Sequence, residues 1–168
     1  QTGQPPADVD QLYFAIWTYP LPRAAIKTLD RRLGMMRSTV TLLEDLNDLK
    51  GRVSELENPE LPRSQVYRIL NQRLPASRWL LRLIEDSPAV VAHLDLFKSN
   101  LSTMRTVTDG QDLKRMGLQP GPAYREVLEA ARDGWLDGSI VSEAEERALV
   151  ETLVAGLLAE PSPDTRLK

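Results

Sequence analysis

The sequence predicts an all-α protein with eight or nine short helices in an irregular bundle, divided into two helical subdomains. Three observations indicate this fold class. Apolar residues recur at spacings of three and four, which is the period of amphipathic helices. No run alternates apolar and polar residues between turn residues, as a half-buried strand would. Prolines interrupt the helical pattern repeatedly, so the helices are expected to be short.

The first helices are delimited by prolines and a glycine. A short helix around Leu12 is expected to end before Pro20. Pro22 suits the first position of a second helix, because its fixed φ is already helical, and this helix is expected to end at Gly34. A longer amphipathic helix is predicted over residues 35–56, where leucines keep the helical spacing.

The segment 58–62 contains two prolines, and each disfavours helix in the residue before it. We place a subdomain boundary there. It separates neck-like or connecting helices over residues 8–60 from a helical domain over residues 61–160. The ends, residues 1–7 and 161–168, are expected to be disordered tails.

Helix caps organise the second half of the chain. Ser64 is expected to cap one helix, and the segment 86–88 another. Asp109 caps a short helix, and Ser142 with Glu145 forms a capping box that starts the last helix. The core face of that last helix is expected to contain Ala148, Leu149, Thr152, Leu153 and Leu157.

Composition excludes several classes of protein. The chain contains no cysteine, which excludes disulfides and thiolate metal sites and fits a cytoplasmic protein. No apolar run approaches the roughly 18 residues of a membrane span, so we expect no membrane partner. The chain does not begin with Met, and we expect it to be a segment of a longer protein.

Charge is distributed unevenly along the chain. The net charge is −3, which argues against an autonomous nucleic-acid binder. Residues 23–42 nevertheless carry a net charge of +4, and residues 61–84 carry five arginines and no acid. Residues 109–160 hold eleven acids against five bases. A polyanion would be attracted to the first two regions and repelled by the third.

The acid-free stretch supplies the RNA-binding candidates. Five arginines could share a concave face and neutralise phosphates, and a neighbouring tryptophan could stack on a base. An ordinary solvated basic face and a core tryptophan are the competing interpretations. The candidates are Arg63, Arg68, Arg73, Arg78, Arg82 and Trp79.

A second basic stripe lies on one face of the second predicted helix. Its members, Arg23, Lys27 and Arg31, are four residues apart. They could track a phosphate backbone or pair with acids on the next helix. We favour intramolecular pairing, with Glu44, Asp45 and Asp48 as the acids.

The turn at Gly117, Pro120, Gly121 and Pro122 is the most particular local motif. Glycine permits positive φ, and the prolines preset the entry to the next helix. Free N–H groups at a helix start can face a phosphate. On local physics alone, a structural corner between packed helices is the favoured interpretation.

Two further motifs could suggest a metal site. Asp8 and Asp10 form a carboxylate pair, but their context is a helix start, where acids suit the helix dipole. His93 is the single histidine and has no cysteine to accompany it. Neither motif predicts a metal or a catalytic residue.

The punctuating residues together resemble the C-terminal region of the bacterial tRNA nucleotidyltransferase (CCA-adding) and poly(A) polymerase family. The resemblance covers about residues 62–158, whereas residues 8–57 match weakly. The residues that carry it are Thr108 to Gly110 with Asp112-Leu113, Gly117-Leu118, Pro120-Gly121-Pro122, Leu136-Asp137-Gly138, and Glu143, Glu145 and Glu146.

The resemblance implies a non-catalytic helical domain that binds RNA and positions it for a transferase. Its partners would be the 3′ end of a tRNA or another RNA, and the catalytic head and neck of the same parent chain. Mg²⁺ and nucleoside triphosphates would bind in that head, because no Gly-Ser precedes Asp8-Val9-Asp10 and the head's metal site is absent here. Asp48 stands where the family's nucleotide-selecting neck motif has arginine, so nucleotide recognition is not carried over.

A helical interaction or dimerisation module without RNA binding is the alternative. In that case the leucines of residues 35–56 would pair with a second copy of the chain.

Overall fold

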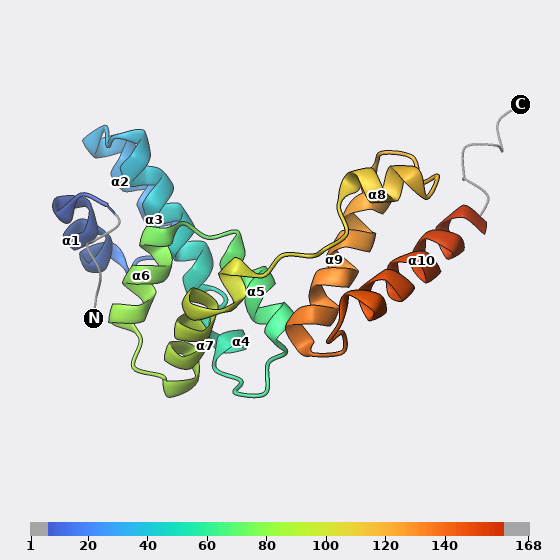
Figure 1. The fold of residues 1–168 in the computed structure, drawn as a ribbon. Helices are drawn as coiled ribbons and strands as arrows, with labels where there is room; N and C mark the ends of the chain where they lie inside the picture. The colour runs from blue at the N-terminus through green and yellow to red at the C-terminus, as the bar shows by residue number, and fades with distance from the viewer. Residues whose placement is uncertain (1–6, 160–168) are drawn as a thin grey trace, which may run out of the picture. The chain divides into compact units, whose positions relative to one another are not determined.

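The computed structural model describes residues 7–159, and every regular element in that range is helical, which confirms the all-α prediction (Figure 1). The tails expected at residues 1–7 and 161–168 lie outside this range, apart from Ala7. The elements are α1 (Val9–Thr18), α2 (Arg23–Leu33), α3 (Arg37–Lys50), α4 (Val53–Leu56), α5 (Arg63–Asn71), α6 (Pro75–Ile84), α7 (Pro88–Ser99), the 3₁₀ helix η1 (Leu101–Thr103), α8 (Gly110–Arg115), α9 (Pro122–Asp137) and α10 (Glu143–Ala159).

The helices form two compact units, unit 1 over residues 1–102 and unit 2 over residues 103–168. This division lies away from the boundary expected at residues 58–62. The reason is that α3, before that segment, packs against α6, after it. The two prolines therefore interrupt a helix without separating two cores. The neck-like and RNA-binding assignments of residues 8–60 and 61–160 stay predictions.

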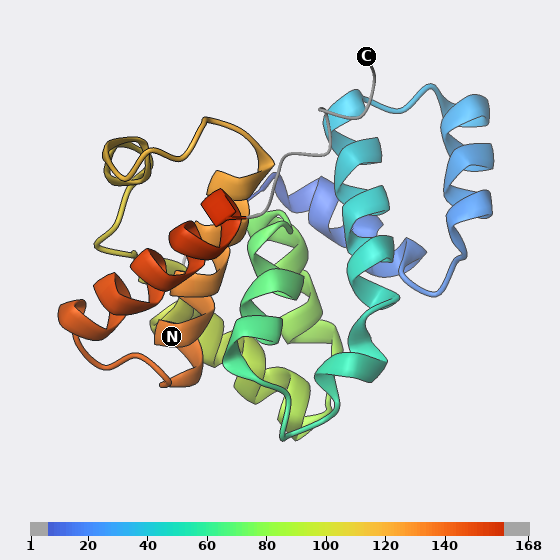
Figure 2. The same ribbon diagram turned by 90° about the vertical axis from the view of Figure 1, so that its right-hand side faces the viewer.

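Helix α3 forms the centre of unit 1, and α1, α2 and α6 all contact it. Figure 2 shows α2 and α3 side by side, joined by a short turn. The leucines of α3 bury their side chains between these helices. The buried cluster consists of Leu12, Ala15, Ile26, Leu42, Leu43, Leu46, Ala76 and Leu80.

The helix predicted over residues 35–56 is divided in two. Helix α3 ends at Lys50, and the four-residue α4 follows after Gly51 and Arg52. Glycine has a low helix propensity, and Arg52 takes the non-helical angles φ −106° and ψ 1°. Leu49 and Leu56 are both fully buried on either side of this break.

The caps are partly as predicted. Gly34 ends α2 in the left-handed region with φ 59°, and Asp109 forms a capping box with Asp112. The Ser64 prediction was wrong, because α5 begins one residue earlier and Ser64 is buried inside it. The Ser142 hydroxyl accepts a hydrogen bond from the Glu145 N–H over 3.3 Å, as expected of a cap.

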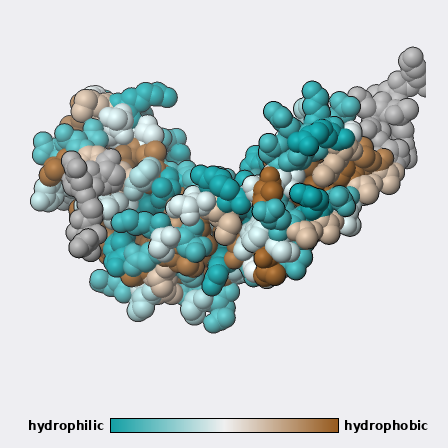
Figure 3. Space-filling view, in the orientation of Figure 1, coloured by the Kyte–Doolittle hydropathy of each residue, from teal (hydrophilic) through white to brown (hydrophobic). Residues whose placement is uncertain are grey.

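Unit 2 is built on α9 and α10, which lie side by side (Figure 1). Its core joins these helices to α8 and to the turn that follows α8. Figure 3 shows hydrophilic residues over α8, whereas hydrophobic residues follow α10. The buried cluster consists of Leu113, Leu118, Val127, Ala131, Val150 and Val154.

The predicted core face of α10 was correct in part. Leu153 and Leu157 pack against the core of unit 2, and Leu149 is half-buried. Ala148 and Thr152 are exposed, whereas the fully buried residues are Glu146, Val150 and Val154, which the predicted face did not include.

Candidate nucleic-acid interface

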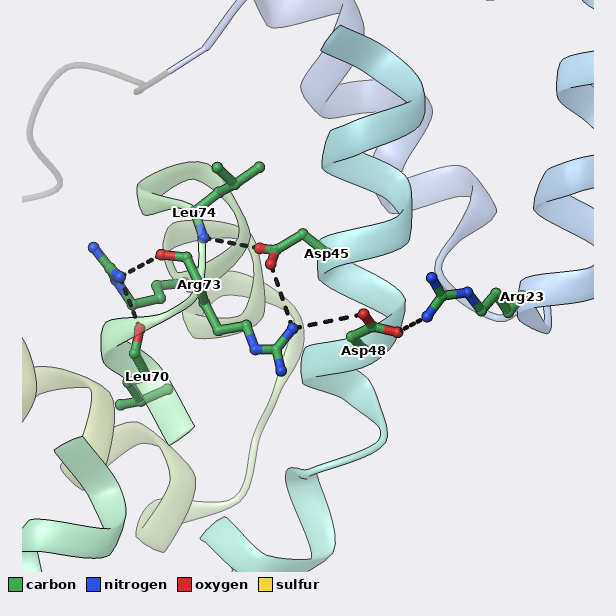
Figure 4. Close-up of polar contacts among 7 residues, drawn as sticks. Arg23, Asp45, Asp48, Leu70, Arg73 and Leu74 are labelled. Carbon is green, nitrogen blue, oxygen red and sulfur yellow. Dashed lines mark hydrogen bonds and ion pairs between the residues drawn. The ribbon is translucent and has the colours of Figure 1, made fainter. Parts of the chain in front are cut away.

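Arg73 lies between two carboxylates of α3 rather than in solvent (Figure 4). Its guanidinium is 3.4 Å from an Asp45 oxygen and 3.7 Å from an Asp48 oxygen. The other Asp45 oxygen accepts a hydrogen bond from the Leu74 N–H over 2.8 Å. Only 18 % of the Arg73 side chain is exposed. Arg73 therefore joins the start of α6 to α3.

Arg78 caps the end of α5. Its guanidinium donates to the Leu70 carbonyl over 2.8 Å and to the Arg73 carbonyl (Figure 4). The same guanidinium lies over the Phe97 ring. The Leu70 carbonyl also accepts from the Arg73 N–H over 3.1 Å, so Arg78 adds a second donor there and supplies one to the Arg73 carbonyl just after α5. Burial lowers the pKa of Arg78, and the nearby charge of Asp45 acts in the opposite direction. The guanidinium remains charged, as arginine does in proteins.

Arg82 is exposed but paired. Its guanidinium forms two hydrogen bonds with the Asp95 carboxylate of α7, over 3.0 and 3.2 Å. The hydrogen bond to Asp95 raises the pKa of Arg82. An RNA phosphate would have to compete with this carboxylate for the same donors.

Trp79 is half-buried against the core of unit 1. Its indole N–H is buried and has no hydrogen-bond partner among the described residues. Its packing against the core and its buried N–H favour the core interpretation. Of the six predicted residues, Arg63 and Arg68 lie exposed on the surface of α5, and Arg68 has an interaction partner within the described part of the chain.

Residues 61–84 contain no acid, but in the folded unit carboxylates from other helices lie beside their arginines. The carboxylates that face it come from α3 and α7, at separations of 13 to 28 residues in sequence. Sequence reasoning missed them because it counted charges along the chain. The predicted concave basic face over α5 and α6 is largely consumed by the packing of unit 1.

The pairing expected for the stripe on α2 is confirmed at its first member. Arg23 forms an ion pair with Asp48 (Figure 4). Arg31 donates from Nε to the Lys27 carbonyl over 3.4 Å, within its own helix. The later cations of this region have no carboxylate partner among the described residues. We call this set the basic corner; it consists of Lys27, Arg31, Arg32 and Arg37.

The turn between α8 and α9 is exposed along its backbone but anchored at one point. Leu118 is 6 % exposed and packs in the core of unit 2. Its N–H donates to the Leu113 carbonyl over 3.1 Å, and its own carbonyl accepts from the Tyr124 hydroxyl over 3.0 Å. Gly117 has φ 89°, which only glycine adopts readily. Sequence and structure agree on a rigid corner here.

Gly121 differs from Gly117, because neither conformation nor crowding requires a glycine there. Its backbone is extended, with φ 169° and ψ −164°. A Cβ atom on Gly121 would meet only the Gln119 carbonyl oxygen, at 4.0 Å. The space beside Gly121 is open to a molecule outside the chain.

The two metal motifs have structural roles. The Asp8 carboxylate caps α1 by accepting from the Asp10 N–H over 2.9 Å. The buried His93 ring lies 3.0 Å from the Leu56 carbonyl oxygen through Nδ1. Within residues 7–159, no group of three or more His, Asp or Glu side chains converges as metal ligands would. None of the helices in that range has the length and apolar character needed to cross a bilayer.

Comparison with protein-family models, curated proteins and solved structures found no match.

Proposed function

We propose that this chain is a non-catalytic helical domain that binds RNA and positions it for a polynucleotide adenylyltransferase or CCA-adding tRNA nucleotidyltransferase. The catalytic head, with its Mg²⁺ and nucleoside triphosphate, would lie elsewhere in the parent protein. The family resemblance over residues 62–158 motivates the proposal. The observation that carries it furthest is the turn between α8 and α9.

This turn is exposed on both sides of the buried Leu118, and two of its exposed residues are glycines without side chains. Gly117, Pro120, Gly121 and Pro122 are all exposed, while Leu118 holds the turn to the core. A nucleic-acid backbone can approach closely where side chains are absent, and main-chain N–H groups at a helix start favour phosphate. The unexplained glycine at position 121 fits such an approach, because an internal corner would tolerate alanine there.

RNA binding by the whole chain tests the proposal. Labelled tRNA should bind in a fluorescence-anisotropy titration at about 50 mM salt, and the affinity should fall steeply toward 200 mM salt. A chain that shows no salt-dependent binding of tRNA or of an RNA hairpin with a free 3′ end would contradict the proposal.

The role of the turn has its own test. Gly121→Ala should leave the unfolding midpoint unchanged, because the added methyl group enters open space. It should weaken tRNA binding by about tenfold if a phosphate contacts this backbone. Gly156→Ala is the matched control, since a Cβ at Gly156 also meets nothing within 4 Å. Equal RNA affinity for both variants would reduce the turn to a structural corner.

The alternative, an interaction or dimerisation module, is favoured by a different helix from the one predicted. The leucines of α3 are buried inside unit 1 and cannot pair with a second copy. Helix α1, in contrast, exposes an apolar stripe whose members lie three to four residues apart. They are Val9, Tyr13, Ile16 and Trp17, exposed by 52 %, 69 %, 40 % and 72 %.

Sedimentation equilibrium separates the two functions. A dimer that dissociates on Trp17→Lys and ignores RNA would favour the interaction module. A monomer that binds tRNA would favour the RNA-positioning role.

A further inference from the structure

We propose that the basic corner of unit 1 binds the phosphate backbone of RNA. This inference rests on the RNA-binding role proposed above, and it assigns the electrostatic contact to residues other than the arginines of α5 and α6. Its basis is the difference between cations that the fold neutralises and cations that it leaves unpaired.

Four cations follow one another from the middle of α2 to the start of α3. Lys27 and Arg31 are four residues apart, which places them on one helix face about 6 Å apart along the axis. The left-handed Gly34, whose N–H donates to the Asp30 carbonyl over 2.8 Å, ends α2 and turns the chain into α3. Arg32 precedes this turn, and Arg37 is the first residue of α3. All four side chains belong to exposed residues.

These four cations are unpaired in the described part of the chain. None forms an ion pair there, whereas Arg23, Arg73 and Arg82 all do. The one acid between residues 27 and 37 is Asp30. It is half-buried and lies one helical turn after Ile26, so it is on the face that packs against α3. A phosphate at the basic corner would not displace an internal carboxylate.

Unpaired surface cations favour a polyanion through counterion release. Each phosphate neutralised by a lysine or arginine releases condensed counterions, which makes binding favourable and salt-dependent. Arg73, between α5 and α6, and Arg82, in α6, would first have to give up their partners Asp45 and Asp95. The energetically accessible contact is therefore at the basic corner.

An anionic membrane is the other polyanionic surface to weigh. A helix that lies in a bilayer interface needs a whole apolar face to insert. The apolar face of α2 is already used, because Ile26 is 2 % exposed and belongs to the core of unit 1. Leu33 and Met36 are the exposed large apolar residues at this corner. The basic corner thus presents positive charge but no whole apolar face to insert into a bilayer, so it fits RNA better than a membrane.

The experiment compares three charge-neutralised proteins in salt titrations with labelled tRNA. The first is K27Q/R31Q/R32Q/R37Q, the second is R63Q/R68Q, and the control is K98Q/R147Q. The first variant should reduce the slope of log affinity against log salt concentration by about 3, at 0.7 to 0.9 per phosphate contact, and weaken low-salt binding by about 10- to 100-fold. The control cations are exposed residues that form no ion pair in the described range.

The outcomes distinguish a failure of the basic-corner proposal from a failure of the RNA-binding proposal. Retention of affinity and slope by the first variant, with loss in R63Q/R68Q, would overturn the basic corner and leave the RNA-binding role intact. Equal losses in the first variant and the control, scaled by charge, would also overturn it, because binding would then depend on net charge alone. A wild-type chain that binds phosphatidylserine vesicles and no RNA would overturn both proposals. Circular dichroism of each variant confirms that it is folded.

Discussion

The Trp135 indole N–H donates a hydrogen bond to the Glu146 carboxylate over 2.5 Å, in the interior of unit 2. The same carboxylate accepts from the Val107 and Thr108 N–H groups, over 3.0 and 2.7 Å. Glu146 is fully buried, so its charge is offset by these donors. One side chain of α10 thereby fixes both α9 and the segment before α8.

Replacement of Glu146 by glutamine should destabilise unit 2 by about 1 to 3 kcal/mol. The amide NH₂ group cannot accept a hydrogen bond, so at least one of the three donors would lose its partner. Thermal unfolding followed by circular dichroism would measure the loss. Glu151→Gln is the matched control, since Glu151 is exposed on the same helix and should cost less than about 0.5 kcal/mol. Equal effects of the two substitutions would show that the buried carboxylate is not the anchor.

Acid should weaken the fold through the same residue. Burial by itself would raise the pKa of Glu146, but the hydrogen bonds from Thr108, Val107 and Trp135 outweigh it, and the pKa lies below its usual range. A lowered folded-state pKa stabilises the fold above the unfolded-state value of about 4.3. This stabilisation should be lost as the pH falls from there through the folded-state pKa. The pH dependence of unfolding in E146Q should be flatter in that window.

The Arg73–Asp45 pair should couple more strongly than an exposed pair. Its side chains are 18 % and 14 % exposed, compared with 43 % and 58 % for Arg82 and Asp95. A double-mutant cycle with Arg73→Gln and Asp45→Asn should give about 1 to 3 kcal/mol. The cycle for Arg82 and Asp95 should give about 0.2 to 1 kcal/mol. Chemical denaturation measures both, and a reversed order would contradict the bridging role of Arg73.

Arg78 should affect stability rather than RNA binding. Arg78→Met should cost about 1 to 3 kcal/mol, because the Arg73 carbonyl loses its donor and the Leu70 carbonyl loses one of its donors. Arg78→Lys should recover part of that loss, since an ammonium group can still donate. At a temperature where the variants are folded, tRNA affinity should change by less than about twofold, well under the tenfold that 1.4 kcal/mol represents. A large affinity loss in folded R78K would place Arg78 at the RNA instead.

Alanine at Gly134 should destabilise unit 2 although it lies inside a helix. A Cβ there would come within 2.8 Å of Ile140 Cγ1 and 3.3 Å of the Ser139 hydroxyl. The clash should outweigh the roughly 1 kcal/mol that alanine gains over glycine in a helix and leave a net loss of about 1 to 2 kcal/mol. Gly156→Ala, in open space on α10, should instead stabilise slightly. Ile140→Val combined with Gly134→Ala should restore part of the loss.

The helical fold was predictable because its signals are local. The spacing of Val127 and Ala131, the cap at Asp109 and the stop at Gly34 each depend on a few neighbouring residues. The boundary between the two units was not predictable, because it depends on whether α6 folds back onto α3. The buried stripe of α10 was missed for a related reason. A glutamate enters a core only when distant N–H groups reach it, and those of Val107 and Thr108 are 39 and 38 residues away.

The candidate site was predictable only in part. The corner at Gly117 follows from residue types that restrict the backbone, and the structure contains it. The arginines of α5 and α6 could not be sorted from sequence, because Asp45 and Asp95 reach them only in the folded unit. The cations of α2 were recognised as a stripe, but their division into a paired member, Arg23, and the unpaired basic corner required the fold.

The open space beside Gly121 has a practical consequence. A cysteine at this position would be the single thiol of the chain, since the natural sequence has none. A fluorophore attached there would lie on the exposed turn without entering the core of unit 2. Its emission would report directly which molecules approach the corner between α8 and α9.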